Sequence, residues 1–474
     1  MSYAIYVGKN LTHSGVAFLA GYGDEPSSHW LEVVPRTTHA AGSSIVVGAT
    51  DKADLPGVLS EIPQATETAS HVRVCYSFYK GTPAPLTNGG LNEYGVAVRD
   101  VWSPSRPELV AMTPTTQSGP NYSELCRIVL ERAKSAREGV ELIASLIAEH
   151  GHVSYGGNSH LIADDNEAWM VIEFAGGEGL WAAERLGPDS IRVSRPGYIE
   201  NIPPEGDGGR DFLWSPNFIS FASEKGWYEA GIGTPFNVNT IYGDGLHRWA
   251  GVRWVEGELS AKAAGPQKIG IQDIMYFLRT ERLTGDSAGY GQVVPLFNSP
   301  QAELRMIWHA HIGAASAPFT PVFLGINCVP EEFRQHRYLT HPESQLFIDA
   351  RRPHVRSVVP RGIESTRSAT QVFKRLQYLA FQHSDVFIPE LHATWQAVEN
   401  RLVVEVANVV KLAELALLAG ERSLAVQYLT SYTEGELLKA LDMAEKMAIA
   451  MELRTKVLFG ISSGSDLSRP EQIW

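Results

Sequence analysis

The chain has 474 residues, enough for about three average domains or for one large layered domain with an extension. Its 40 basic and 53 acidic residues give a net charge of −13, whereas proteins that bind a phosphate backbone carry a basic patch, so no nucleic acid is expected as a partner. Hydrophobic residues at 44% and charged residues at 20% are close to the averages of soluble globular proteins, which excludes a largely disordered, collagen-like or coiled-coil chain.

Three cysteines are spread along the chain, at Cys75, Cys126 and Cys328, and they form no CxxC pair. An odd, scattered set predicts neither a disulfide framework nor a thiolate metal site, and it fits a reducing compartment. The first residues, MSYAIYVGKN, lack the pattern of a secretory leader, and the most apolar helical stretch is interrupted by Lys411 and Glu414. We therefore expect a cytoplasmic protein with no membrane partner.

Short β-rich runs broken by Gly, Pro and Asn turns dominate the chain from Ser2 to about Ser194, and many of them alternate as strands with one covered face do. These runs are YAIYVG, GVAFLAGYG, HWLEVVPR, SSIVVGA, HVRVCYSFY, YGVAVRDVW, HLIADDNEAWMVIEF and SIRVS. One clear helical stretch, YSELCRIVLERAKSAREGVELIASLIAEHG, interrupts them, with Gly151 as a C-cap signal. Strands on both sides of central helices predict an α+β fold of stacked sheets with outer helices.

The rest of the chain divides by composition. Residues 195–300 are rich in Gly, Pro, Trp and Tyr, which is typical of long structured loops that cover a pocket. Two further strand-like runs, LRMIWHAHI and TPVFLGINCV, precede a region of helical periodicity that begins at about residue 364. We therefore predict a layered domain over residues 2–363, with 195–300 as its loop-rich cover, and a helical C-terminal region over 364–474 that could join copies into a homo-oligomer.

Ser2 is the first candidate for chemistry, because a small second residue favours removal of Met1 and leaves Ser2 with a free α-amino group. Such an amine titrates near ~7.7–8.0, so it can accept the proton of its own hydroxyl, directly or through one water. This is the principle of N-terminal nucleophile catalysis. The alternative is an ordinary chain start, since many proteins begin Met-Ser, and retention of Met1 would remove the base.

Four segments in order resemble peptidase family C69, dipeptidases of the N-terminal nucleophile (Ntn) hydrolases. They are SYAIYVGKNLTHSG, GGLNEYGVAV, GGNSHLIADDNEAWMVIEF and SAPFTPVFLGI, and the likeness extends from Ser2 to about Phe333. Ser2 falls on the position of the family's nucleophilic cysteine. The resemblance implies a four-layer αββα Ntn fold followed by a helical region, a small peptide or amide substrate, and no cofactor.

Two departures from the family's pattern concern the site. Where the family shows Arg-Asn-x-Asp, this chain reads Gly21-Tyr22-Gly23-Asp24, so the arginine is missing and Asp24 remains. The resemblance implies that the Asp24 carboxylate hydrogen-bonds the Ser2 ammonium and tunes the base, although a turn role for Asp24 is also open.

The second departure is the asparagine that the wider superfamily uses in its oxyanion hole, since the corresponding stretch here is Ser194-Arg195-Pro196-Gly197. Asn158 and Asn92 are the candidates that remain, because a side-chain amide can donate to a developing oxyanion. Both follow glycines, so a role in a turn is the alternative for each of them.

Three residues are predicted to bind substrate. The resemblance places an arginine after the cover, and Arg248 is the nearest match, with Arg253 competing for the alignment; a guanidinium grips a carboxylate through two hydrogen bonds. A surface salt bridge is the alternative role for Arg248. Tyr22 and Trp249 are expected to line the pocket, which would suit an apolar or aromatic acyl group.

Other motifs give little support to cofactor chemistry. His309 and His311 lie at strand spacing on one face, but two histidines without a third ligand do not indicate a metal, so none is expected. The chain has no glycine-rich nucleotide motif between a strand and a helix, and no GxSxG elbow.

The sequence thus predicts an Ntn-type amidohydrolase in which Ser2 forms an acyl-enzyme with a peptide or other small amide, and water releases the acid. Two alternatives are open. In one, an amine captures the acyl group and the protein is an amide-forming acyltransferase. In the other, the protein is a non-catalytic Ntn-fold binding protein. The substrate itself is not fixed by these residues.

Overall fold

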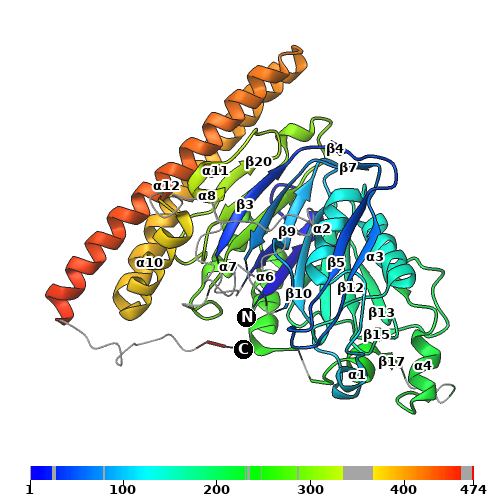
Figure 1. The fold of residues 1–474 in the computed structure, drawn as a ribbon. Coiled ribbons are helices and arrows are strands. Elements are labelled where there is room, and N and C mark those ends of the chain that lie inside the picture. Colours follow the sequence, from blue (N-terminus) through cyan, green and yellow to red (C-terminus); the bar gives the residue numbers. More distant parts are fainter. Residues whose placement is uncertain are drawn as a thin grey trace.

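Two antiparallel sheets stacked face to face form the centre of the molecule (Figure 1). The structure is a computed structural model that describes residues 2–23, 28–77, 79, 81–229, 231, 235–246, 248–285, 288–334, 367–460 and 472–473. No helix in these residues has an apolar stretch long enough to cross a membrane.

The first sheet has six strands and contains the beginning of the chain. In spatial order it consists of β14 (Ile191–Ser194), β1 (Tyr3–Val7), β2 (Ala17–Tyr22), β18 (Gly291–Leu296), β19 (Met306–Ala310) and β20 (Thr320–Phe323). All neighbours are antiparallel. The strand β1 is therefore an interior strand, and all five of its residues are buried.

The second sheet has eight strands. In spatial order it consists of β16 (Phe212–Trp214), β13 (Trp181–Leu186), β12 (Ala168–Glu173), β11 (Asn158–Ala163), β10 (Ala97–Trp102), β9 (Leu86–Asn92), β8 (His71–Tyr76) and β3 (His29–Val34). Its side chains alternate between two cores, because successive residues of a strand point to opposite faces. Leu161 faces the six-stranded sheet, whereas Ile162 packs against helices on the outside.

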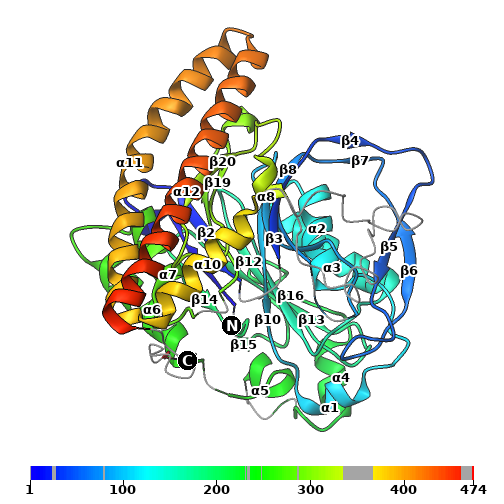
Figure 2. The ribbon, with the colours of Figure 1, turned by 60° about the vertical axis from the view of Figure 1, so that its left-hand side comes forward.

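Helices cover the outer face of each sheet (Figure 2). The helices α2 (Tyr122–Arg132) and α3 (Ala136–His150) pack on the eight-stranded sheet, and α6 (Ala250–Ala264) and α7 (Ile271–Arg279) pack on the six-stranded sheet. The order is thus helix, sheet, sheet, helix, which confirms the predicted four-layer αββα arrangement of an α+β fold.

The shorter elements are η1 (Lys9–Leu11), β4 (Thr37–Thr38), β5 (Ser44–Gly48), β6 (Leu59–Pro63), β7 (Glu67–Thr68), α1 (Pro107–Met112), β15 (Asn201–Ile202), α4 (Phe218–Glu224), β17 (Phe236–Asn237), α5 (Val238–Tyr242), η2 (Ala302–Leu304) and α8 (Glu331–Arg334).

The central helical stretch of the sequence is two helices, and local capping explains the break. Asn121 and Glu124 form a capping box at the start of α2, and Ser135 caps the start of α3 by accepting a hydrogen bond from the Glu138 N–H. Gly151 ends α3 with a φ of 82°, which confirms it as the C-cap, because this left-handed conformation favours glycine.

Three long helices of the described residues, α10 (Ala369–Gln382), α11 (Ser384–Leu418) and α12 (Arg422–Phe459), follow the last strand. The helices α11 and α12 pack on β20, α10 packs on α11 and α12, and Phe373 and Trp395 belong to the same apolar core as β1. The far end of the α11–α12 hairpin extends beyond the sheets (Figure 1). The predicted domain boundary at residues 363 and 364 lies outside the described residues.

A buried ion pair joins α11 to α7. The Arg279 guanidinium makes two hydrogen bonds to the Glu399 carboxylate, and the side chains are 5% and 2% exposed. Glu399 also accepts a hydrogen bond from the Phe319 N–H at 2.8 Å. The carboxylate therefore connects a C-terminal helix to the layered core at three points.

We expect Glu399→Gln to lower the free energy of unfolding by about 3–5 kcal/mol, because it leaves the Arg279 charge buried without its partner. The exposed pair on the same helix, Glu390 with Arg454, provides the control, and Glu390→Gln should lower it by about 0–1 kcal/mol. Urea denaturation followed by circular dichroism measures both. Equal losses in the two variants would contradict this role of the buried pair.

Candidate functional site

Ser2 lies immediately before β1, at one end of the six-stranded sheet, and is half-buried. The register pairs Tyr3 with Tyr22 and Ala4 with both Gly21 and Ser194. Ser2 is therefore next to the ends of β2 and β14. Alternation along an extended chain places Ser2 on the face of Ala4, which is turned toward the eight-stranded sheet.

A buried arginine that the sequence analysis did not select fills the space between the sheets at this end. Arg99 on β10 is fully buried, and its side chain crosses to β2 at Gly21. A Cβ atom at position 21 would overlap the Arg99 Nε atom, and one at Gly89 would lie 2.9 Å from its Cδ atom. Neither glycine has a positive φ, so both are needed here for space.

Hydrogen bonds hold the Arg99 guanidinium in this position. Its Nη1 atom donates to the backbone and side-chain oxygens of Asn88 and to the Tyr290 hydroxyl, and Nη2 donates to the Tyr22 carbonyl at 3.0 Å. Within the described part of the chain, Arg99 makes no ion pair and its Nε atom has no hydrogen-bond partner. This differs from Arg73, Arg127 and Arg279, which are buried too and pair with glutamates.

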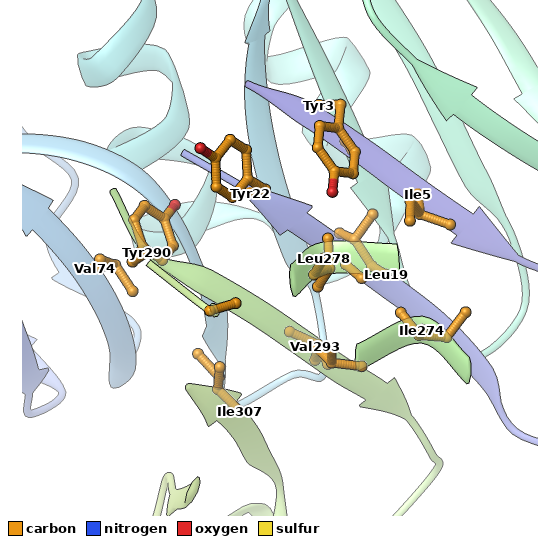
Figure 3. Packing of buried hydrophobic residues seen from close by; sticks show 14 of the residues in the cluster. Tyr3, Ile5, Leu19, Tyr22, Val74, Ile274, Leu278, Tyr290, Val293 and Ile307 are labelled. Carbon is orange, nitrogen blue, oxygen red and sulfur yellow. The ribbon is translucent and has the colours of Figure 1, made fainter. Parts of the chain in front are cut away.

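The predicted residues Tyr22 and Trp249 lie on the outer side of the six-stranded sheet. The rings of Tyr3 and Tyr22 stack with centroids 5.3 Å apart, and Figure 3 shows both at the same end of neighbouring strands. Arg195, which follows β14, is buried near them and packs 4.0 Å above the Trp249 ring. Burial lowers the pKa of Arg195 to about 9, which leaves it charged at neutral pH, while the Tyr22 and Tyr3 hydroxyls act in the opposite direction. The structure thus brings Tyr22 and Trp249 together around a second guanidinium.

Arg248, the predicted carboxylate ligand, already holds a carboxylate of its own chain. Its guanidinium bonds both oxygens of Glu256 on α6 and donates to the Val193 carbonyl at 2.8 Å. Glu256 also accepts from the Val193 N–H at 2.8 Å. This pair fastens α6 to β14, so a substrate carboxylate would have to compete with Glu256.

Asn158 lies at the same end of the fold as Ser2 but on the outer face of β11, toward α2. Its side-chain oxygen accepts from the Tyr155 hydroxyl at 3.0 Å, and its register partner is Glu173. The next residue, Ser159, faces the six-stranded sheet, where a Cβ atom at Gly197 would overlap its side chain. The sheet therefore separates the Asn158 amide from the space between the sheets.

Next to Asn158, a fully buried His160–Glu173 pair shares one proton. The Nε2 atom of His160 donates to the Tyr122 carbonyl at 2.9 Å, and Nδ1 lies 2.7 Å from a Glu173 oxygen. Burial alone would lower the pKa of His160, but the Glu173 charge raises it above its ordinary value. Burial raises the pKa of Glu173 above its ordinary value, while the His160 charge acts in the opposite direction.

Asn92 lies at the other end of β9, far from Ser2. Its side-chain nitrogen donates to the Leu130 and Ala133 carbonyls at 3.2 and 2.7 Å, and its oxygen accepts from the Tyr94 and Val96 N–H groups. All four hydrogen-bonding positions of the amide are used. They connect the end of α2 to the turn before β10.

Asp24, the predicted partner of the Ser2 amine, lies outside the described residues. The described residues contain no group of three or more metal-ligating side chains. They do form a hollow of about 430 Å³ between the end of α3 and β13, which includes His152, Trp181 and Asn217 but none of the predicted site residues.

His309 and His311 form a buried relay that has fixed proton positions. Thr370 donates its hydroxyl proton to the His29 carbonyl at 2.9 Å, so its oxygen accepts from Nε2 of His311 at 3.2 Å. Nδ1 of His311 must then accept from Nε2 of His309, 3.1 Å away. Both rings are neutral, and burial lowers the pKa of His309 to about 3.

Comparisons with known proteins match parts of this chain. Residues 79–248 match the family model of Peptidase family C69. A probable dipeptidase of Latilactobacillus sakei is 26% identical over 43% of this chain and 46% of its own length. A probable dipeptidase of Salmonella dublin is 28% identical over 37% of this chain and 40% of its own length. The chain therefore spans less than half the length of these curated relatives.

Solved structures give a weaker likeness. A mutant of the conjugated bile acid hydrolase from Clostridium perfringens covers 66% of this chain, and 89% of that protein is matched. The sequence identity is 12% and the TM-score is 0.28. The four layers follow from this chain's own strand order and register.

We expect the free energy of unfolding to fall as the pH decreases from about 6.5 toward 3, because unfolded histidines bind protons that folded His309 does not. Above about pH 6.5 this contribution is complete and constant. The variant His309→Gln, whose amide can still donate to His311, should show a smaller loss between pH 6.5 and 4.5 in urea denaturation. The same pH slope in wild type and variant would contradict the assignment.

Proposed function

We propose that this chain is an amidohydrolase whose nucleophile is Ser2 after removal of Met1, because residues 79–248 match the model of Peptidase family C69 and parts of the chain are similar to probable dipeptidases. The position of Ser2 is the observation that carries this proposal. It directly precedes a buried interior strand, between the ends of β2 and β14 and on the face turned toward the second sheet. Strand neighbours on both sides would hold the nucleophile in one place, as catalysis requires.

The proposed reaction has two halves. The Ser2 Oγ attacks an amide carbonyl while its proton passes to the Ser2 α-amine, directly or through one water. The resulting ammonium gives that proton to the leaving nitrogen as the C–N bond breaks, which leaves an ester on Ser2. Water then attacks the ester with the α-amine again acting as base, and the acid is released.

Serine in place of cysteine makes the base more important. A thiol is partly ionised at neutral pH, whereas a hydroxyl becomes an effective nucleophile only through its base. Asp24 keeps its proposed role as the carboxylate that orients the amine. Tyr22 and Trp249 lie around Arg195 on the other face of the six-stranded sheet from Ser2, so we propose that they border the part of the substrate that extends past the end of this sheet. Arg248 would contribute only by exchanging Glu256 for a substrate carboxylate.

Ser2→Ala should reduce kcat/KM by about 10³-fold or more on a panel of dipeptides and small acyl amides, because the nucleophile is lost. Ser2→Cys should keep measurable turnover, since it retains both nucleophile and amine. The exposed Ser14→Ala is the matched control and should have no effect. The intact mass of untagged protein must first be short by one methionine; a mass that retains Met1 would overturn the mechanism.

The acyltransferase alternative has a different product. If an amine captures the acyl-enzyme, added amino acid amides should divert product from acid to amide, and Ser2→Ala should abolish the diversion. An unchanged acid yield at all amine concentrations would exclude this alternative.

The binding-protein alternative predicts no turnover by wild type and the same ligand affinity in Ser2→Ala. Association into a homo-oligomer through the helical region stays a prediction.

A further inference from the structure

The buried guanidinium between the sheets has no carboxylate partner in the described part of the chain. A charge taken out of water is normally paired, and Arg73, Arg127 and Arg279 of this protein follow that rule with Glu32, Glu131 and Glu399. Among the described residues, Arg99 instead has only neutral acceptors, which are Asn88, Tyr290 and the Tyr22 carbonyl. Its positive charge is therefore not cancelled at close range by a described residue.

The surroundings of Arg99 leave room for its side chain on both sheets. Gly21 on β2 and Gly89 on β9 each lack the Cβ atom that would collide with it. The Tyr290 ring lies 5.0 Å from the guanidinium carbon and adds a cation–π contact. Since Asp100, the next residue of β10, is on the opposite face near His160, it does not neutralise Arg99 directly.

The register brings this charge close to Ser2. Gly21, where Arg99 crosses, is paired with Ala4, and Ser2 is two residues from Ala4 along the same extended segment. Strand geometry places the guanidinium roughly 8 Å from the start of Ser2. In a water-poor space between two sheets, a unit charge at that separation acts strongly on another charge.

We propose that Arg99 is a positioning residue for Ser2, whose unpaired positive charge keeps the Ser2 α-amino group in its neutral, proton-accepting form at neutral pH. The inference rests on the proposed function, because the neutral amine matters to the reaction only if Ser2 is the nucleophile. Its physical basis is repulsion, since a second positive charge disfavours protonation of the amine. This supplies the base on which a serine hydroxyl depends.

The other groups around the start of β1 do not remove this effect. Described titratable and charged groups on the elements packed here are Tyr3, Tyr22, His29, Tyr290, His309, Arg195, the Arg248–Glu256 pair of α6 and the Arg279–Glu399 pair of α7. The two ion pairs are neutral overall, and Arg195 adds positive charge. Asp24, outside the described residues, would act in the opposite direction as a carboxylate, so removing it and removing Arg99 should have opposite effects.

The test measures the protonation of the Ser2 amine directly. Protein shown by its mass to lack Met1 is acetylated with trace acetic anhydride at a series of pH values, and the N-terminal peptide is quantified by mass spectrometry. We expect the wild-type midpoint to lie below the ordinary ~7.7–8.0 and to return to that range in denaturing urea. In Arg99→Met the midpoint should rise by about one to two pH units, from Coulomb's law at an effective dielectric of about 20.

Two variants separate charge from packing. Arg99→Lys keeps the charge and should keep the low midpoint. Arg73→Met removes an equally buried arginine that is paired with Glu32 on the face turned toward α2, and it should leave the midpoint unchanged. Asp24→Asn should lower the midpoint further.

The proposal is overturned if the acetylation midpoint of folded wild-type protein lies in the ordinary range of ~7.7–8.0. This first outcome does not depend on the folding of any variant. It is also overturned if the midpoint stays low in Arg99→Met. Because labelling needs no substrate, these outcomes are independent of turnover. Failure of Ser2→Ala to reduce turnover would instead remove the proposed function. In an active enzyme, the acidic limb of kcat/KM against pH should move with the labelling midpoint.

Discussion

The space between two stacked sheets has to be filled, and here one end of it is filled by a charged side chain. Facing sheets lie about 10 Å apart, so a long side chain on an inner face can reach the opposite strand only where that strand has no side chain in its path. Arg99 does so because Gly21 and Gly89 have no side chains. This arrangement determines what can surround Ser2: β2 presents backbone rather than a side chain at Gly21, and the cation comes from the other sheet.

Buried charge is managed in two ways in this fold. In the helical layers, arginines are paired with glutamates, as in Arg127 with Glu131 on α2, and Arg279 with Glu399 between α7 and α11. Such pairs hold elements in place, because losing either partner leaves an uncompensated charge. Near the start of β1, Arg99 is held by neutral acceptors instead, and Arg195 lies against an aromatic ring. Burial lowers the pKa of Arg195, and pKa values shifted by burial are common at functional sites.

Local sequence signals were sufficient for much of the fold. Alternating runs predicted the strands, Gly151 predicted the end of α3, and stacked sheets with outer helices followed from the order of the elements. The break between α2 and α3 was not predicted, because the apolar spacing continues across it and the Ser135 cap is a subtle signal. In the site, the sequence alone showed that Gly21 stands where the C69 pattern has an arginine. A charged residue at an inward position of the run YGVAVRDVW was the signal that could have found Arg99.

The sequence by itself determined which residues are strand-forming, which positions alternate, and which small residue precedes the first strand. Those properties depend on neighbours along the chain, so a linear pattern carries them. Only the tertiary structure decided that Asn158 faces α2 and that Arg248 is bound to Glu256. It also decided that the Asn92 amide makes its hydrogen bonds at the far end of β9. It also brought Arg99 to Gly21, 78 positions away in the chain. The reason is physical: a contact between two sheets depends on register and on which face each side chain occupies, and one residue's shift would reverse both.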